Sequence, residues 1–110
     1  MKTNRQPTEK HAAIELAALG NQTRLRVFKL LIRAGNEGLN IGAIQRHLRI
    51  PASTLAHHLS TLSNAGLVQQ TQRGREVRCI VDFEAMNGLV GYLTEQCCSG
   101  VRLDEGEQVA

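Results

Sequence analysis

IPASTLAHHLSTLSNAGLV, residues 50–68, is the stretch of the sequence that decides the fold. Pro51 stands where a helix can begin, because its missing N–H would have no partner in the first turn. Leu55, Leu59 and Leu62 recur at the spacing i, i+4 and i+7, so they share one face of an α-helix. Gly66 can adopt the left-handed conformation that closes a helix. The stretch therefore predicts an amphipathic helix with a leucine face.

The side of this helix opposite the leucines consists of small or hydrogen-bonding residues and carries no acid. Its members are Ala52, Ser53, Ala56, His57 and Ser60. A surface of this kind can enter a groove of DNA without steric clash or charge repulsion. We therefore interpret it as the recognition helix of a winged helix-turn-helix, with double-stranded DNA as the expected partner.

The preceding segments predict three further helices. Thr8, Asn21 and Asn40 are suitable N-caps for helices over residues 9–18, 22–34 and 41–48. The apolar positions of these helices are Ala12, Ile14, Leu16, Ala17 and Leu19, then Leu25, Phe28, Leu31 and Ile32, then Ile41, Ile44 and Leu48. The third of these helices and the recognition helix follow each other closely, as in a helix-turn-helix.

After the recognition helix the period of the sequence changes from 3.6 to 2. Residues 67–72 and 75–81 read as two strands, with Gly74 in the turn between them. The tip of this hairpin carries Gln72, Arg73 and Arg75. A basic hairpin after a helix-turn-helix is a wing, suited to contacts with phosphates or the minor groove. The expected fold class is thus mainly α with a β-hairpin wing.

The last predicted helix, over residues 83–96 with Asp82 as its cap, is unusually apolar. Its stripe consists of Phe83, Met86, Leu89, Val90 and Leu93. Because the rest of the domain already has a core, we favour burial of this stripe against a second copy of the chain. The first and last helices would then form the interface of a homodimer. The rival interpretation is ordinary packing within one chain.

The distribution of charge is more informative than the net charge of +3. Residues 20–80 carry nine Lys and Arg against two Glu, a net charge of +7, whereas residues 81–110 have a net charge of −5. The cations therefore cluster in the segment that holds the predicted recognition helix, as a surface for a polyanion requires. The alternative is a solvated basic face.

Length and composition indicate one globular domain. The chain has 110 residues, of which 42% are hydrophobic, and no apolar run approaches the roughly 18 residues that span a bilayer. The first ten residues have no signal-peptide core, so we expect a cytoplasmic protein with reduced thiols and no membrane contact. We expect residues 1–7 to be disordered, residues 8–98 to form the DNA-binding and dimerisation domain, and residues 99–110 to form a disordered acidic tail.

Three stretches, taken in order, resemble the ArsR family of bacterial winged-helix repressors, also called ArsR/SmtB. They are ALGNQTRLRVFKLL (residues 18–31), STLAHHLSTLSNAGLV (53–68) and GREVRCIV (74–81). The resemblance covers about residues 12–98. It implies an α-α-α-α-β-β-α homodimer that binds operator DNA near its own promoter and releases it when an inducer binds. It also implies DNA contacts at Ala52, Ser53, Thr54, Ala56 and His57, and it leaves His58 either structural or in contact with DNA.

Within this resemblance the cysteines are the candidate inducer site. The zinc patterns of the family fit poorly, because the helix IGAIQRHL has no cysteine. The positions that hold histidine or carboxylate ligands around the last helix of relatives are Asp82, Glu84, Glu95 and Cys98 here, and neither of the expected histidines is present. Cys97 and Cys98 match a vicinal pair with which some relatives bind trivalent arsenicals. Adjacent thiolates suit such a thiophilic centre.

Cys79 is a possible third member of this site. A helix over residues 83–96 is about 20 Å long, so Cys79 would reach the pair only across an antiparallel dimer interface. Alternatively, Cys79 is a small core residue and the pair belongs to a frayed helix end. A third possibility is sensing of oxidants or persulfides by the thiols. No cofactor is required in any of these versions.

Other functional classes fit less well. The sequence has no glycine-rich phosphate loop, no catalytic metal cluster and no nucleophile with an obvious base, so we do not expect an enzyme. Three aromatic residues, Phe28, Phe83 and Tyr92, are too few for RNA binding by base stacking. The runner-up is a winged-helix module that binds protein, which a hydrophobic or acidic outer face on the recognition helix would favour.

Overall fold

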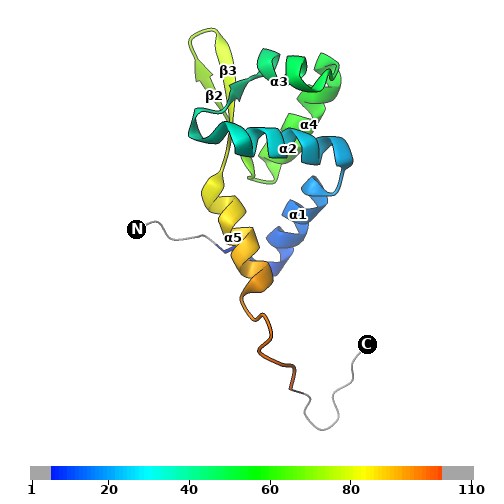
Figure 1. The fold of residues 1–110 in the computed structure, drawn as a ribbon, viewed down its shortest axis with the longest axis vertical. Coiled ribbons are helices and arrows are strands. Elements are labelled where there is room, and N and C mark those ends of the chain that lie inside the picture. Colours follow the sequence, from blue (N-terminus) through cyan, green and yellow to red (C-terminus); the bar gives the residue numbers. More distant parts are fainter. Residues whose placement is uncertain (1–5, 103–110) are drawn as a thin grey trace.

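The computed structural model describes residues 6–102, which form five α-helices and a three-stranded antiparallel sheet. In chain order the elements are α1 (Glu9–Leu19), α2 (Gln22–Ala34), the 3₁₀ turn η1 (Gly35–Glu37), β1 (Leu39–Asn40), α3 (Ile41–Leu48), α4 (Ala52–Asn64), β2 (Val68–Arg73), β3 (Glu76–Val81) and α5 (Phe83–Thr94). The wing and α3 lie at one end of the molecule, and α1 and α5 converge at the other (Figure 1). The predicted winged helix-turn-helix fold is confirmed. Of the residues predicted to be disordered, 1–7 and 99–110, residues 1–5 and 103–110 lie outside the described range.

All four predicted N-caps are present. In each case the side-chain oxygen accepts a hydrogen bond from the backbone N–H three residues later, which satisfies a donor that the first helical turn leaves free. The distances are 3.1 Å for Thr8, 2.9 Å for Asn21, 2.8 Å for Asn40 and 3.0 Å for Asp82. These local signals therefore set the starts of α1, α2, α3 and α5.

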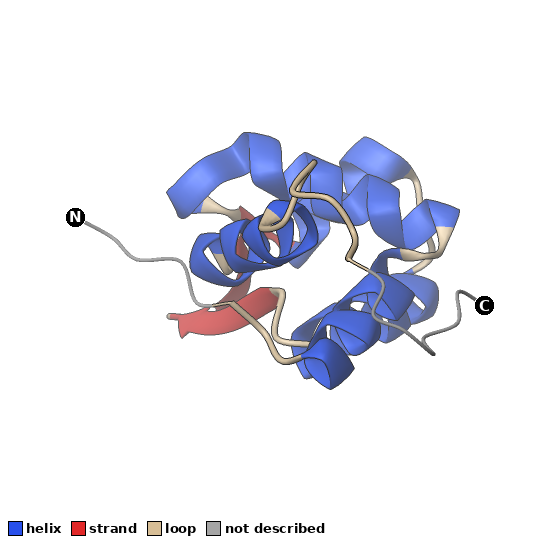
Figure 2. Cartoon of the chain, turned by 90° about the horizontal axis from the view of Figure 1, so that it is seen from below, coloured by secondary structure: helices blue, strands red, loops and turns tan. Residues whose placement is uncertain are grey.

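The sheet has the strand order β1-β3-β2 and lies to one side of the helices (Figure 2). In the hairpin, Val68 pairs with Val81 and Arg73 with Glu76, close to the predicted strands. The two-residue strand β1 was not predicted, because two residues are too few to show an alternating pattern. Gly38 precedes it with φ +66°, and a Cβ there would collide with the Cys79 carbonyl oxygen, so this close approach to β3 requires glycine.

The core forms around the leucine face of α4. Leu55, Leu59 and Leu62 are at most 1% exposed, and they pack in one cluster with Val27, Phe28 and Leu31 of α2. Ile44 from α3 and Leu67, Val68, Cys79 and Val81 from the hairpin complete the centre of this cluster. The predicted leucine face is thus the part of α4 that holds the domain together.

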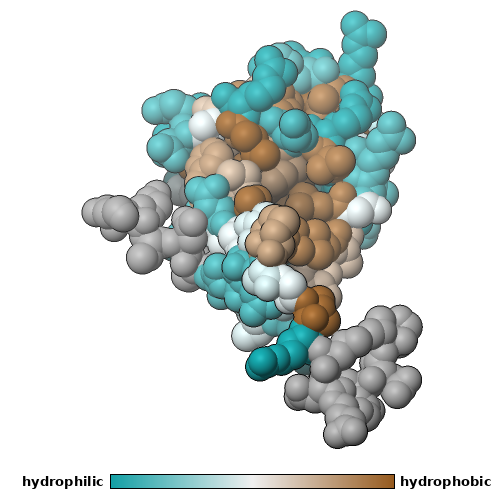
Figure 3. All heavy atoms as spheres, turned by 60° about the horizontal axis from the view of Figure 1, so that its bottom comes forward, coloured by the Kyte–Doolittle hydropathy of each residue, from teal (hydrophilic) through white to brown (hydrophobic). Residues whose placement is uncertain are grey.

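Several apolar residues of α1 and α5 lie on the surface of the single chain. In α1 the buried positions are Ala12, Glu15 and Ala18, whereas Ile14 and Leu16 are 45% and 43% exposed. In α5, which ends at Thr94 rather than at residue 96, Val90 and Leu93 are 55% and 57% exposed. Hydrophobic residues gather on the face seen from this end of the molecule (Figure 3). The apolar stripe of α5 is therefore only partly covered within one chain.

Leu25 of α2 is also exposed, contrary to its predicted place on a buried face. Its spacing groups it with Phe28 and Leu31, yet it is 44% exposed, because α2 turns Val27 and Leu30 inward instead.

None of the helices in the described part of the chain has the length and apolar character needed to cross a bilayer.

We expect Leu59→Ala to lower the free energy of unfolding by about 2–5 kcal/mol, because it removes a buried side chain and leaves a cavity. Ser60→Ala is the matched control on the exposed side of the same helix and should change this free energy by about 0.5 kcal/mol or less. Urea denaturation at one fixed protein concentration measures both values. Equal effects of the two substitutions would contradict the assignment of the leucine face.

Candidate nucleic-acid interface

The outer face of α4 is open to solvent along its length. Every residue predicted to contact DNA from this helix is exposed, namely Ala52, Ser53, Thr54, Ala56, His57 and Ser60. None of them is acidic, and the helix begins after Pro51 without a capping side chain from any described residue. The first-turn N–H groups of α4 therefore remain available to an anion.

The turn before α4 holds this helix against α3. Arg49 adopts the left-handed conformation with φ +55°, and its N–H donates to the Gln45 carbonyl oxygen at 2.7 Å. The Gln45 side-chain amide donates to the Ile50 carbonyl oxygen at 3.3 Å, while the Ile50 side chain is buried. The arrangement of α3, turn and α4 is that of a helix-turn-helix, in which the second helix enters the major groove.

His58 is a structural residue in this arrangement. It is 8% exposed, and Arg24 of α2 donates to its Nδ1 at 3.4 Å. Burial lowers the pKa of His58, and the positive charge of Arg24 and the neighbouring His57 lower it further. The guanidinium of Arg24 also donates from Nε to the Ala18 carbonyl oxygen at 2.6 Å. Arg24 thus joins α1, α2 and α4 rather than facing a ligand.

His11 connects α1 to the end of α4. Its Nε2 donates to the Ala65 carbonyl oxygen at 3.0 Å and lies 3.6 Å from the buried carboxylate of Glu15. No motif marks such a contact in the sequence, because the two partners are 54 residues apart.

The tip of the wing carries the predicted basic residues. Gln72, Arg73 and Arg75 are exposed around Gly74, whose φ of +63° forms the turn. The Gln72 amide donates to the Gly74 carbonyl oxygen at 2.9 Å, which stiffens the tip. At the base of β2, Gln70 donates to Ser63 at 3.1 Å and so connects the wing to α4. The Gln70–Ser63 hydrogen bond thus joins the strand that leads to the exposed cations to the recognition helix.

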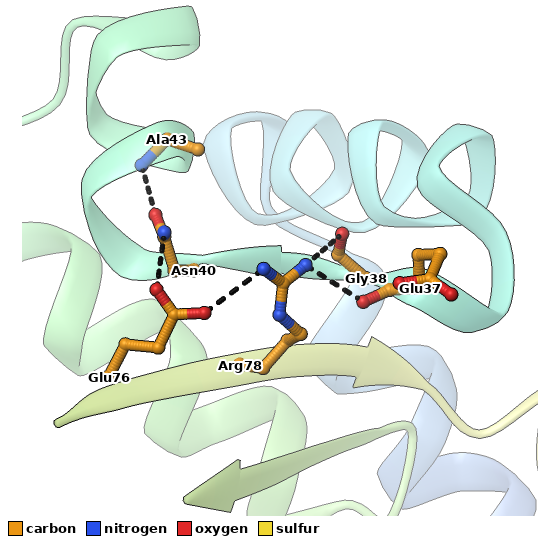
Figure 4. Close-up of polar contacts among 6 residues, drawn as sticks. All are labelled: Glu37, Gly38, Asn40, Ala43, Glu76 and Arg78. Atoms are coloured by element: carbon orange, nitrogen blue, oxygen red, sulfur yellow. Dashed lines mark hydrogen bonds and ion pairs between the residues drawn. The ribbon is translucent and has the colours of Figure 1, made fainter. Parts of the chain in front are cut away.

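Arg78, which belongs to the same basic segment of the sequence, has a different orientation. Its guanidinium turns toward β1 and is surrounded by the carbonyl oxygens of Glu37 and Gly38 and by the carboxylate of Glu76 (Figure 4). Its charge is therefore already engaged within the fold, whereas the side chains of Arg73 and Arg75 are exposed.

The three cysteines lie in two different environments. Cys79 is fully buried at the centre of the sheet, and burial raises the pKa of its thiol to about 11. Cys97 and Cys98 are exposed beyond the end of α5, with their sulfur atoms 3.3 Å apart. Within residues 6–102, no three His, Cys, Asp or Glu side chains are grouped closely enough to hold a metal ion.

Known proteins resemble this chain in sequence and in fold. Residues 19–71 match a family described as a helix-turn-helix domain. The chain is 32% identical over 101 residues to the HTH-type transcriptional regulator CmtR of Mycobacterium tuberculosis, over 84% of this chain and 82% of CmtR. It also resembles the solved structure of an ArsR-like transcriptional regulator from Rhodococcus sp. RHA1, with a TM-score of 0.70, 26% identity and 78% of each chain covered. The AntR antimony-specific transcriptional repressor has the same fold, with a TM-score of 0.61, 20% identity and 83% of each chain covered.

We expect iodoacetamide at about pH 8 to alkylate Cys97 and Cys98 quickly and Cys79 only after unfolding. At that pH a thiol with a pKa of about 11 is on the order of one part in a thousand thiolate, and Cys79 is also shielded from the reagent. Mass spectrometry of the labelled peptides measures the three rates, with the denatured chain as the control. Rapid labelling of Cys79 in the folded chain would contradict its placement in the core.

Proposed function

The chain belongs to the ArsR family of winged helix-turn-helix transcriptional regulators, and from this we propose that it is a dimeric repressor that binds operator DNA. The observation that carries the proposal is the exposed, acid-free face of α4 on a helix whose other side is fully buried. In this proposal Ser53, Thr54, His57 and Ser60 contact base edges, and Ala52 and Ala56 allow the helix to approach closely.

The wing supplies the second part of the proposed interface. Arg73 and Arg75 are exposed at its tip, and Gln72 lies beside them. Cations at the tip of a hairpin can bind phosphates on the flank of the groove that α4 occupies, which orients the protein without reading the sequence. The net charge of +7 over residues 20–80 adds a long-range attraction to the duplex.

Dimerisation is proposed from the apolar surface of α1 and α5, at the end of the molecule away from the wing. Ile14 and Leu16 of α1 and Val90 and Leu93 of α5 are 43–57% exposed, more than expected for large side chains that serve only one chain. A second copy packed on this surface would bury them and present two recognition helices to one side of a duplex. Symmetric half-sites one helical turn apart require a separation of about 34–36 Å.

For the inducer we propose a thiophilic species, with a trivalent arsenical as the first candidate. The exposed pair Cys97 and Cys98 offers two sulfur atoms 3.3 Å apart, and Cys97 also borders a hollow of about 410 Å³ with Tyr92 and Leu93. The name of AntR indicates that a repressor of this fold can respond to a related element. Burial of Cys79 favours the version in which the pair acts without it.

Two alternatives remain distinct from this proposal. Oxidants or persulfides would use the same two cysteines through a disulfide or polysulfide bond, which a reductant reverses. A winged-helix module that binds protein would use the face of α4 for a protein partner, but that face is neither acidic nor strongly apolar. Selection of duplexes from a random-sequence library by the full chain separates DNA binding from the protein-binding role.

We expect Ser53→Ala or His57→Ala to weaken binding to the selected duplex about tenfold while binding to unrelated DNA stays the same. Arg73→Ala or Arg75→Ala should weaken binding to both and lower the slope of log K against log salt by roughly 0.9 for each phosphate that is no longer neutralised. Arg102→Ala, an exposed cation beyond α5, is the control with the same charge change. Fluorescence anisotropy across a salt series measures these effects, and sedimentation checks the oligomer. Unchanged binding in all four variants would refute the proposed interface.

We expect the double variant Cys97→Ser with Cys98→Ser to bind the selected duplex normally and to lose release by the inducer. Arsenite, zinc, hydrogen peroxide and polysulfide, each added separately to the preformed complex, identify the class of inducer by gel shift. Cys79→Ala is the control and should still release DNA. Release from the double variant equal to that from the unmodified chain would eliminate the pair as the sensor.

A further inference from the structure

A group of polar side chains joins the wing to the start of α3. Asn40, Glu76 and Arg78 form this group, called here the wing–α3 cluster (Figure 4). Arg78 donates from Nη2 to Glu76 Oε2 at 3.0 Å and from Nη1 to the carbonyl oxygens of Glu37 and Gly38 at 3.1 and 3.2 Å. The Asn40 amide donates to Glu76 Oε1 at 3.0 Å. The carboxylate of Glu76 thus accepts one hydrogen bond on each oxygen.

The orientation of Asn40 is fixed by its role as a helix cap. Its Oδ1 accepts from the Ala43 N–H at 2.8 Å, so only its NH₂ group is left to face Glu76. The hydrogen bonds from Asn40 and Arg78 lower the pKa of Glu76. Since Asn40 starts α3, the first helix of the helix-turn-helix, Glu76 connects the wing directly to the unit that carries α4.

The backbone pairing between β1 and the wing is short. β1 contributes only the pairs of Leu39 with Cys79 and Asn40 with Arg78, while the rest of β3 pairs with β2 within the wing. The base of the hairpin is packed into the core through Val68, Cys79 and Val81, so a change in the direction of the wing has to arise in its outer part, beyond these residues. The wing–α3 cluster lies in this outer part, because Arg78 precedes Cys79 and Glu76 begins β3 next to the tip.

We propose that Asn40, Glu76 and Arg78 are positioning residues for DNA binding, which fix the direction of the wing relative to α4. The inference rests on the proposed function, because Arg73 and Arg75 can bind phosphates while α4 occupies the groove only if the hairpin leaves the fold in the right direction. In this role Arg78 contacts the fold and not the duplex, and Glu76 is an acid that favours DNA binding.

If the charge of Glu76 were its only contribution, this acid would weaken DNA binding, whereas the positioning role predicts that it strengthens DNA binding. The two explanations can therefore be tested against each other. Glu76 and Glu37 are the two acids of residues 20–80, and removing either charge should strengthen the attraction to a polyanion. In Glu76→Gln, however, the new amide has only one oxygen for two donors, so either Asn40 or Arg78 loses its acceptor. Positioning therefore predicts weaker binding, and charge predicts stronger binding.

The test measures the affinity of Glu76→Gln for the duplex that the unmodified chain selects from a random library. We expect a loss of about threefold to tenfold, the range for a partly exposed charged hydrogen bond. Glu37→Gln is the matched control, because it removes the same charge from a side chain with no partner among residues 6–102 and keeps the carbonyl that Arg78 contacts. It should bind the duplex at least as tightly as the unmodified chain.

A second pair of variants separates positioning from other effects. Asn40→Asp with Glu76→Gln reverses the donor and the acceptor, leaves the net charge unchanged, and should restore the affinity. In a chain that already carries Arg73→Ala and Arg75→Ala, Glu76→Gln should cost no further affinity, because the wing then has no cations to position.

Four results would overturn the inference. The first is a Glu76→Gln chain that binds the duplex as tightly as the unmodified chain, and the second is a Glu76→Gln chain that circular dichroism shows to be unfolded at the assay temperature. The third is a chain with Asn40→Asp and Glu76→Gln that does not recover the affinity. The fourth is an equal loss of affinity on Glu76→Gln in the chain that already lacks the cations of Arg73 and Arg75. If the unmodified chain selects no duplex at all, the proposed function itself fails, which is a distinguishable result.

Discussion

Burial of three leucines on one side of α4 is the constraint on which the rest of the structure depends. Leu55, Leu59 and Leu62 are packed against α2, α3 and the hairpin, so α4 cannot rotate without exposing them. Because burial of these leucines turns the other side of the helix to solvent, the same core packing fixes the orientation of the residues proposed to contact DNA. The wing starts from the same cluster, through Val68 and Val81, so the core also anchors its base.

The features that could be predicted from the sequence are those that depend on a few neighbouring residues. The N-caps at Thr8, Asn21, Asn40 and Asp82 need only a side chain and an N–H three residues away. The leucine spacing of α4 and the hairpin around Gly74 are equally local. For the same reason the exposed residues of α4 and of the wing tip could be named in advance as candidates, while their contact with DNA stays a prediction.

The features that could not be predicted depend on partners far away in the chain. β1 exists because Gly38 lets the backbone approach Cys79, and two residues carry no periodicity of their own. Ile14 and Leu25 lie at helical spacing with buried residues, yet the neighbouring helices cover other positions. Charge counting groups Arg78 with Arg73, and only the fold turns its guanidinium toward the Glu37 and Gly38 carbonyl oxygens.

Two of the acceptors that hold Arg78 are carbonyl oxygens of the main chain, which has a consequence for how the protein can diverge. A mutation at position 37 changes a side chain but cannot remove its carbonyl, so that part of the anchorage tolerates genetic drift. Position 38 is restricted instead by the absence of room for a side chain. In proteins that descend from this chain, position 37 should therefore accept many residue types, whereas position 38 should remain glycine.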